Sequence, residues 1–318
     1  METAKTFVLG AGFSASEQFP LVRGLRDRVL HFLQAERHRA YRTFLEAGNG
    51  GHEKGQFFAG LELAESSGVL GFEELLIKLK ADLKNPQPKD PRHITNNVLR
   101  IGCARLLWWF QLSIWRVQQE YANFTQKVAA IPGSAIVSFN WDLLAEKALT
   151  DANIQWNYNL EDSAKVPVLK PHGSINWSGH LREGLSAQYS GWTPIQTGSQ
   201  ISFDVLSPLE NPNKQEINSE LRHMIFPGDL DSSSDPDIKL VWNSVATAIA
   251  RSSKVVFIGY SLPQYDGFAR SFFVRHCQGK LVEVFDPSPE SLKRFKNTFG
   301  EGVTTCELRF EHCDYAKP

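Results

Sequence analysis

Residues Thr6-Phe-Val-Leu-Gly-Ala-Gly-Phe-Ser14 form an apolar run that leads directly into a turn containing two glycines. The apolar part predicts a short buried strand, and the residues after the turn have a helical pattern. Glycines in such a turn allow close backbone approach, and the N-terminus of a following helix offers free N–H groups to a phosphate. The segment therefore predicts an α/β fold with a phosphate-binding turn. A purely structural glycine turn remains an alternative.

The residues after this turn argue against a hydride-transfer domain. The dehydrogenase version of the turn continues to a second strand that ends in Asp or Glu about 20 residues later. Here the chain continues with Leu25-Arg-Asp-Arg-Val29, which is helical in pattern. We therefore expect a different branch of the Rossmann-like α/β folds.

Other apolar runs share the character of the first one. They are rich in β-branched and aromatic residues and are bounded by Gly, Pro or Asn. Strands buried on both faces need not alternate polar and apolar residues, so these runs predict a parallel sheet whose ligands lie at the carboxyl ends of the strands. The predicted strands are Thr6–Gly10, Ala135–Asn140, Val166–Lys170, Lys254–Tyr260 and Leu281–Phe285, with a weaker sixth at Cys306–Glu311.

The long segment between the first two strands predicts an inserted helical subdomain. Leu25, Val29, Phe32 and Leu33 recur at helical spacing, as do Tyr41, Phe44 and Leu45, and a second helix is expected over Asn96–Tyr121. A normal strand-to-helix connection takes only about 2–6 residues. We predict a Rossmann-like domain over residues 1–24, 130–177 and 223–318, a helical subdomain over 25–129, and a surface loop or hairpin excursion over 178–222. A solvated loop over Asp229–Asp237 precedes a helix predicted at Ile238–Arg251.

The composition of the chain limits the kinds of molecule that it is expected to bind. The formal net charge is −1 and the sequence pI is about 6.8, so we expect no direct nucleic-acid or membrane binding. The most apolar stretch, Ile101–Val117, is interrupted by charged residues. It is therefore too polar, and also too short, to span a bilayer. The four cysteines form no Cys-x-x-Cys pair and the histidines have no metal-ligand spacing, so we expect no metal site. The N-terminus contains no apolar signal segment, which makes the cytoplasm the expected compartment.

Four short motifs resemble the sirtuin (Sir2-type) family in type, order and position at predicted strand ends. They are Gly10-Ala11-Gly12-Phe13-Ser14, Ser138-Phe-Asn140-Trp-Asp142, Pro171-His172-Gly173 and Gly259-Tyr260-Ser261-Leu262. The resemblance is closest to the zinc-less, divergent sirtuin-like domains of prokaryotic anti-phage defence, in which an Asp such as Asp266 follows the last motif and the final strand ends in Asp-Pro, here at Asp286. The zinc module of the deacylase branch is missing. Arg23 does not have that branch's spacing from Pro20, which leaves open which residue covers the nicotinamide end.

The resemblance implies that NAD⁺ is the substrate and assigns roles to individual residues. His172 would be the general base, Asn140 would bind a ribose hydroxyl or the attacking water, and Asp142 would hold the nicotinamide carboxamide or the ribose. The implied cofactor-binding residues are Gly10, Ala11, Gly12, Phe13, Ser14, Gly259, Tyr260, Ser261, Asp266 and Asp286.

Structural explanations exist for the same residues. Asn140 is a favoured helix N-cap, Asp142 would suit a helix dipole, and a single histidine such as His172 is often structural. Ser261 and Asp286 are common turn residues.

The implied activity is that of an NAD⁺ hydrolase: cleavage of the nicotinamide–ribose bond to give nicotinamide and ADP-ribose, as an effector of anti-phage defence that depletes NAD⁺. An NAD-dependent protein deacylase or ADP-ribosyltransferase, and a non-catalytic sensor of NAD⁺ or ADP-ribose, remain alternatives. Because an unrestrained NADase would poison its own cell, we expect control by a homo-oligomer or by a separately encoded sensor protein.

Overall fold

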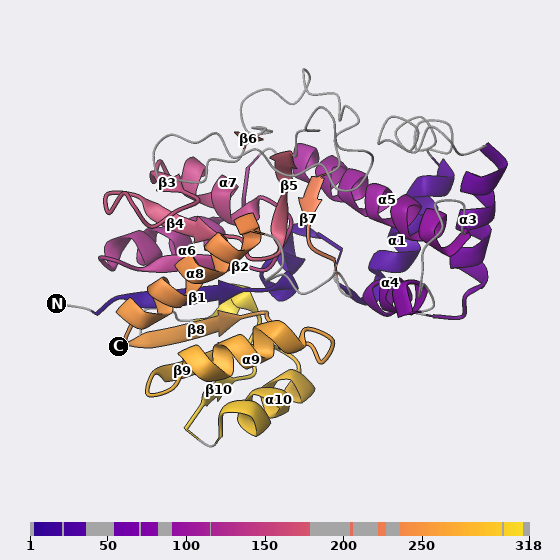
Figure 1. The fold of residues 1–318 in the computed structure, drawn as a ribbon. Helices are drawn as coiled ribbons and strands as arrows, with labels where there is room; N and C mark the ends of the chain where they lie inside the picture. Colours follow the sequence, from indigo (N-terminus) through magenta and orange to yellow (C-terminus); the bar gives the residue numbers. More distant parts are fainter. Residues whose placement is uncertain are drawn as a thin grey trace. The chain divides into compact units, whose positions relative to one another are not determined.

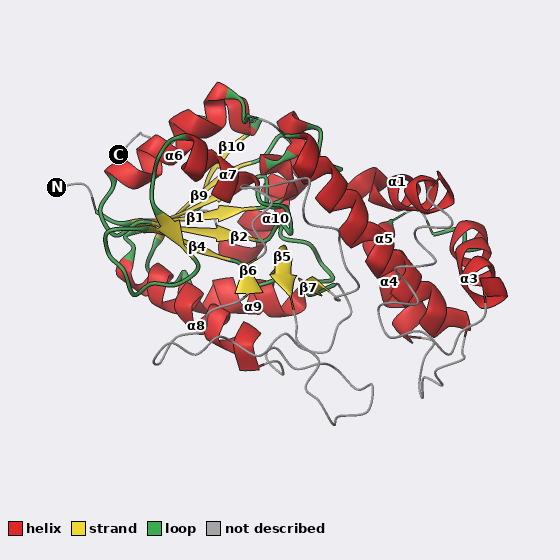
Figure 2. Cartoon of the chain, turned by 90° about the horizontal axis from the view of Figure 1, so that it is seen from above, coloured by secondary structure: helices red, strands yellow, loops and turns green. Residues whose placement is uncertain are grey.

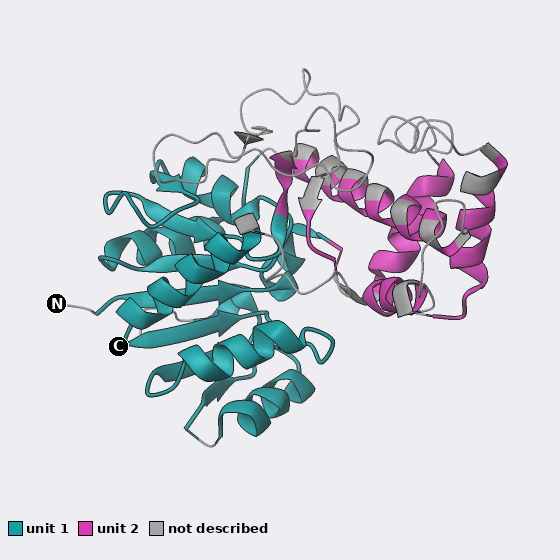
Figure 3. Ribbon diagram, viewed as in Figure 1, with its two compact units in different colours: residues 1–19, 114–173, 231–318 teal, residues 20–113, 174–230 magenta. Residues whose placement is uncertain are grey.

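The structure is a computed structural model of the 318-residue chain. It describes residues 3–20, 22–35, 54–69, 71–81, 91–114, 116–178, 204–205, 222–226, 236–300 and 302–313. The chain divides into two compact units, shown in Figure 3. Unit 1 contains Met1–Phe19, Ile114–Gly173 and Asp231–Pro318, and unit 2 contains Pro20–Ser113 and Ser174–Leu230.

Unit 1 is built on a seven-stranded sheet in which neighbouring strands are parallel (Figure 1). The strand order is β10-β9-β8-β1-β2-β4-β3. The strands are β1 (Lys5–Leu9), β2 (Ala135–Ser138), β3 (Trp156–Asn157), β4 (Val166–Leu169), β8 (Lys254–Ile258), β9 (Leu281–Phe285) and β10 (Thr304–Cys306). The Rossmann-like parallel α/β fold expected from the apolar runs is thereby confirmed.

Two details of the sheet differ from the sequence-based expectation. β3 has only two residues, which is too short to produce an apolar pattern, and the sequence does not predict it. The predicted strand Cys306–Glu311 is strand only at Cys306, and Phe310–His312 form a 3₁₀ turn instead. Burial of Phe310, which is 4% exposed in the core, accounts for the apolar signal in this segment.

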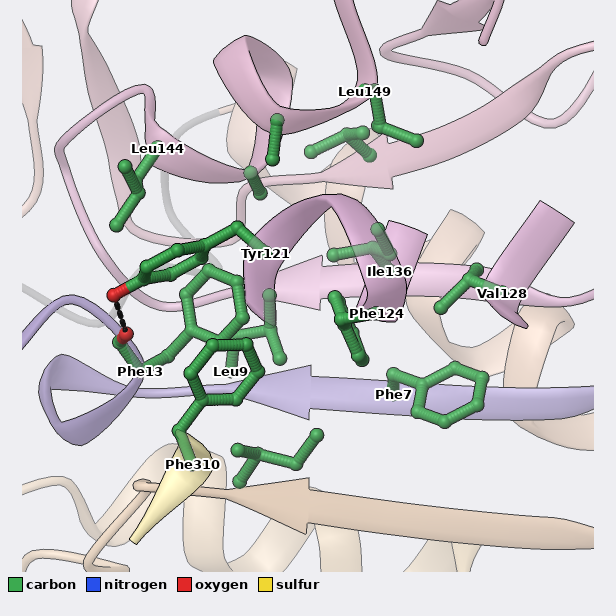
Figure 4. Close-up of a cluster of buried hydrophobic side chains, with 14 of the residues drawn as sticks. Phe7, Leu9, Phe13, Tyr121, Phe124, Val128, Ile136, Leu144, Leu149 and Phe310 are labelled. Atoms are coloured by element: carbon green, nitrogen blue, oxygen red, sulfur yellow. Dashed lines mark hydrogen bonds between the residues drawn. The ribbon is translucent and has the colours of Figure 1, made fainter. Parts of the chain in front are cut away.

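Helices cover both faces of the sheet (Figure 2). On one face lie α6 (Gln119–Ala130) and α7 (Leu144–Asp151), and on the other lie α8 (Pro236–Arg251), α9 (Gly267–His276) and α10 (Pro289–Phe299). Figure 4 shows the core beneath α6, where the Tyr121 hydroxyl donates a hydrogen bond to the Phe13 carbonyl at 2.7 Å. Tyr121, Phe124 and Val128 are almost fully buried here. Residues 114–129 therefore cluster with the sheet unit, although the sequence pattern predicts them in the insertion.

The single helix expected over Asn96–Tyr121 is two helices. α5 (Pro91–Ser113) ends before residue 114, and α6 begins at Gln119. Side chains from distant segments satisfy the backbone at the break: Val117 N–H donates to Asp151 at 3.2 Å, and Gln118 N–H donates to Glu17 at 2.8 Å. These partners are long-range, so local periodicity does not reveal the interruption.

Unit 2 consists of four helices, α1 (Val22–Ala35), α3 (Lys54–Ser66), α4 (Phe72–Ala81) and α5, together with a three-stranded sheet, as far as the structure describes it. Leu25, Val29 and Leu33 are buried on α1, as the helical spacing predicts. The guanidinium of Arg26 donates to the Ala64 and Glu65 carbonyls at 3.1 and 2.9 Å. These bonds satisfy carbonyls in the last turn of α3.

Several predicted segments lie wholly or mostly outside the described residues. These are the helical pattern at Tyr41, Phe44 and Leu45, the loop Asp229–Asp237, and most of the excursion over 178–222. The described parts nearby are β5 (Gly173–Ser178), β6 (Asp204–Val205) and β7 (Arg222–Met224), in the order β6-β5-β7. In the described part of the chain, no helix combines the length and apolar character needed to cross a bilayer.

Candidate active site

The order of the strands defines where a ligand binds in this fold. From β1 the chain proceeds to β2 and β4 on one side of the sheet, and later to β8, β9 and β10 on the other. In open α/β sheets, ligands bind outside the carboxyl ends of the strands at such a reversal. The turn after β1 and the turn after β8 both lie at this point.

These two turns are in direct backbone contact. Gly12 N–H donates to the Gly259 carbonyl at 2.9 Å, and Gly10 N–H donates to the Ile258 carbonyl at 3.0 Å. A Cβ on Gly12 would lie 2.7 Å from Gly259 Cα, and a Cβ on Gly259 would lie 2.5 Å from Gly12 Cα. Gly259 also has a φ of 59°. The glycines of both motifs are therefore required for close packing of the two turns, whatever ligand binds there.

Replacement of Gly259 by alanine tests this contact. The variant adds both a clash with the backbone of Gly12 and the strain of a positive φ. Gly279 is a matched control, because it has a φ of 71° and a Cβ added there would meet nothing within 4 Å. We expect Gly259→Ala to lower the free energy of unfolding by about 1–3 kcal/mol more than Gly279→Ala. Equal losses in chemical denaturation would show that only the backbone angle matters.

Ser14, Asn140 and Asp142 form one buried hydrogen-bonded chain. The Asn140 amide donates to the Gly10 carbonyl and to Ser14 Oγ, each at 2.9 Å, and Ser14 Oγ donates to Asp142 Oδ2 at 2.9 Å. Because a carbonyl only accepts, the bond to Gly10 fixes which way the Asn140 amide faces. Among the described residues no hydrogen-bond donor reaches Asn140 Oδ1.

Asp142 is held by the protein on both carboxylate oxygens. Oδ2 accepts from Ser14, and Oδ1 accepts from Leu144 N–H at 3.0 Å, at the start of α7. Burial raises the pKa of Asp142 above its ordinary value, while Lys170 and these two hydrogen bonds act in the opposite direction. Both carboxylate oxygens of Asp142 therefore bind groups in the segments that follow β1 and β2.

A fully buried ion pair lies beneath this turn, and the sequence analysis did not identify it. Lys170 Nζ is 3.0 Å from Glu146 Oε1, with side chains 0% and 1% exposed. Lys170 also donates to the backbone carbonyl of Asp142. It thereby links the residue after β4, two positions before His172, to the turn after β2. The only signal in the sequence is a lysine at the end of an otherwise apolar strand.

His172 lies at the carboxyl end of β4 against aromatic rings and one carboxylate. Its ring centroid is 4.7 Å from that of Phe139 and 6.5 Å from that of Trp242. Its Nε2 is 3.0 Å from Asp266 Oδ2, and its backbone carbonyl accepts from the indole N–H of Trp141 at 3.0 Å. No hydrogen bond within the described residues joins His172 directly to Asn140, and Trp141 links the two segments.

The other predicted site residues occupy different environments. Phe13 is 1% exposed and packs in the core, and Tyr260 is 5% exposed and lies against Phe139. The carbonyl of Ser261 accepts from Arg294 Nε at 2.9 Å. Asp286, at the end of β9, is 6% exposed, and burial raises its pKa. In the part of the chain that the structure describes, no group of three or more His, Cys, Asp or Glu side chains is arranged to hold a metal ion.

The strand order and the paired glycine turns define a Rossmann-like α/β domain. No family model matches the chain, and no curated protein is similar to it in sequence. Several solved structures of Sir2 proteins are similar to this chain. A Sir2 homologue mutant bound to ADP-ribose is 14% identical, with 98% of this chain and 88% of that chain covered and a TM-score of 0.47. A Sir2 homologue mutant bound to 2′-O-acetyl-ADP-ribose is 15% identical over the same shares, with a TM-score of 0.48.

A third similar structure is Sir2 with a p53 peptide and NAD⁺. It is 13% identical, with 98% of this chain and 90% of that chain covered and a TM-score of 0.38.

Proposed function

We propose that this chain binds NAD⁺ at the carboxyl edge of the sheet and hydrolyses its nicotinamide–ribose bond to nicotinamide and ADP-ribose. The observation that carries the proposal is the convergence of motif residues on the fold's reversal point. The glycine turn, Asn140, His172 and Asp286 follow β1, β2, β4 and β9, respectively. All but Asp286 belong to the four segments that resemble sirtuins in sequence.

The residues suit the demands of this bond cleavage. The bond from ribose C1′ to the nicotinamide nitrogen breaks through an oxocarbenium-like transition state, as in other glycoside hydrolyses. Asn140 Oδ1 accepts a hydrogen bond from the attacking water or a ribose hydroxyl and so orients it. The water oxygen bonds to C1′, His172 accepts the water proton, and the bonding electrons leave with nicotinamide. Asp286 accepts hydrogen bonds from hydroxyls of the ADP-ribose part.

The wider biological role belongs to the same proposal. The sequence resemblance supports an anti-phage effector that depletes NAD⁺, and we propose that it acts in the cytoplasm. Because unrestrained NAD⁺ hydrolysis would poison the cell, its activity would be controlled by self-assembly or by a separately encoded sensor. A transferase that passes ADP-ribose to a protein or acyl group would use the same bond cleavage. A sensor would bind NAD⁺ or ADP-ribose without cleavage.

Product analysis separates these three functions. We expect purified chain incubated with NAD⁺ to release nicotinamide and free ADP-ribose in equal amounts, measured by chromatography. Nicotinamide release that requires an added protein or acylated peptide would indicate a transferase instead. Binding of ADP-ribose by calorimetry without any nicotinamide release, in both monomeric and self-associated fractions, would contradict the hydrolase and support a sensor.

A further inference from the structure

His172 lies beside a carboxylate that comes from a distant part of the sheet. Asp266 Oδ2 lies 3.0 Å from His172 Nε2, with side chains 12% and 20% exposed, respectively. His172 follows β4 and Asp266 follows β8, and two strands, β1 and β2, lie between these in the sheet. The contact therefore exists only because the ends of non-neighbouring strands meet.

The two oxygens of Asp266 have different partners. Oδ1 accepts the N–H of Ala269 at 3.0 Å and caps the N-terminus of α9. Oδ2 faces the imidazole. Arg270 is the other charged group near this carboxylate, and its guanidinium donates to the Gln264 carbonyl at 2.6 Å. Oδ1 is thus engaged by the helix, and Oδ2 is buried at ion-pair distance from the imidazole, with no other hydrogen bond to it among the described residues.

Asp266 is ionised near neutral pH. Burial acts to raise its pKa, but the charge and hydrogen bonding of His172, the Ala269 N–H and Arg270 together bring this pKa below its ordinary value. An ionised carboxylate can accept a hydrogen bond from a protonated ring nitrogen. Among the described residues, Phe139 and Trp242 also lie beside the imidazole and present aromatic rings to it.

We propose that Asp266 is the positioning residue of the histidine base rather than a ligand contact. It holds the Nε2–H of His172, which leaves Nδ1 as the nitrogen that accepts the proton of the attacking water. Its negative charge then stabilises the imidazolium formed in that step, as the aspartate does in Asp–His pairs of hydrolases. This inference rests on the proposed hydrolysis of NAD⁺, and it reassigns Asp266 from the cofactor-binding role that the sequence resemblance implied.

Two substitutions separate this role from capping of α9. Asparagine and serine are both favoured N-caps, so Asp266→Asn and Asp266→Ser keep an acceptor for Ala269 while removing the charge. We expect kcat for nicotinamide release to fall at least about tenfold in both, with KM for NAD⁺ within about twofold. The pH–rate profile of both variants should also differ from that of the wild type, because the charge beside the base is removed. Asp162→Asn is the control: Asp162 also accepts a backbone N–H, from Ala164 at 3.0 Å, and is exposed. This control should keep the wild-type rate and profile.

The possible outcomes distinguish failure of the Asp266–His172 interaction from failure of the proposed NAD⁺ hydrolysis. Unchanged kcat and pH profile in both variants would show that Asp266 only caps α9, and a raised KM with unchanged kcat would show a ligand contact; either overturns the inference. Proton NMR supplies a readout independent of activity, namely a downfield, slowly exchanging Nε2–H of His172 in the wild type that is lost in Asp266→Ser. Absence of this signal from the wild type refutes the pair even if NAD⁺ is cleaved. Its presence in a chain that never cleaves NAD⁺ refutes the proposed function and, with it, the positioning role.

Discussion

His172→Ala will lower kcat for nicotinamide release by about 10²–10⁴-fold, the range expected when a general acid–base group is removed. An imidazole can accept a proton near neutral pH, and His172 supplies one at the end of β4. The substitution leaves Gly10, Ser14 and Asn140 hydrogen-bonded as before, since His172 makes none of those contacts. Affinity for ADP-ribose, measured by calorimetry, should therefore change only a few-fold.

His276→Ala is the matched control for this loss. His276 is the last residue of α9, and its ring lies tilted against that of Phe272, with ring centroids 4.3 Å apart. It belongs to the same unit as His172. It should keep the wild-type rate. If His172→Ala retains wild-type turnover while folding normally, the histidine is structural and the proposed mechanism is wrong.

Lys170→Met will destabilise the protein by about 3–5 kcal/mol, because it leaves the buried carboxylate of Glu146 without its counter-ion. Both side chains of the pair are at most 1% exposed. The remaining described contact to Glu146 Oε1 is the Tyr158 hydroxyl at 3.1 Å, which does not supply a charge. The same substitution frees the Asp142 carbonyl from Lys170. Denaturant unfolding measures the loss.

A second variant shows whether the loss comes from the unpaired charge. In Lys170→Met combined with Glu146→Leu, both charges are absent and the space is filled by apolar groups, so we expect most of the lost stability to return. Lys165→Met is the surface control. Its ion pair with Asp162 is 3.1 Å long but 37% and 43% exposed, and its removal should be close to undetectable. A double variant no more stable than Lys170→Met alone would show that packing, and not charge, dominates.

Much of the fold follows from short-range pattern. The apolar runs that became β1, β2, β4, β8 and β9 have the composition of buried strands, and the stripe through Leu25 and Val29 has helical spacing. The break between α5 and α6 has no such signature, because Asp151 and Glu17 satisfy its backbone from far away in the sequence. Residues 114–129 cluster with the sheet unit, whereas the sequence pattern predicts them in the inserted subdomain.

The candidate site is likewise only partly predictable from the sequence. Local motifs locate the glycine turns, Asn140, Asp142 and His172 at strand ends, since a polar or glycine residue after a buried apolar run is visible in the chain itself. The partners of these residues come from the order of the strands: Ser14 with Asp142, Lys170 with Glu146, and Asp266 with His172. Strand order depends on long-range packing across the whole sheet, and residue spacing along the chain does not encode it. Motif composition thus determines which groups are available for chemistry, and the three-dimensional arrangement alone decides which of them bind each other.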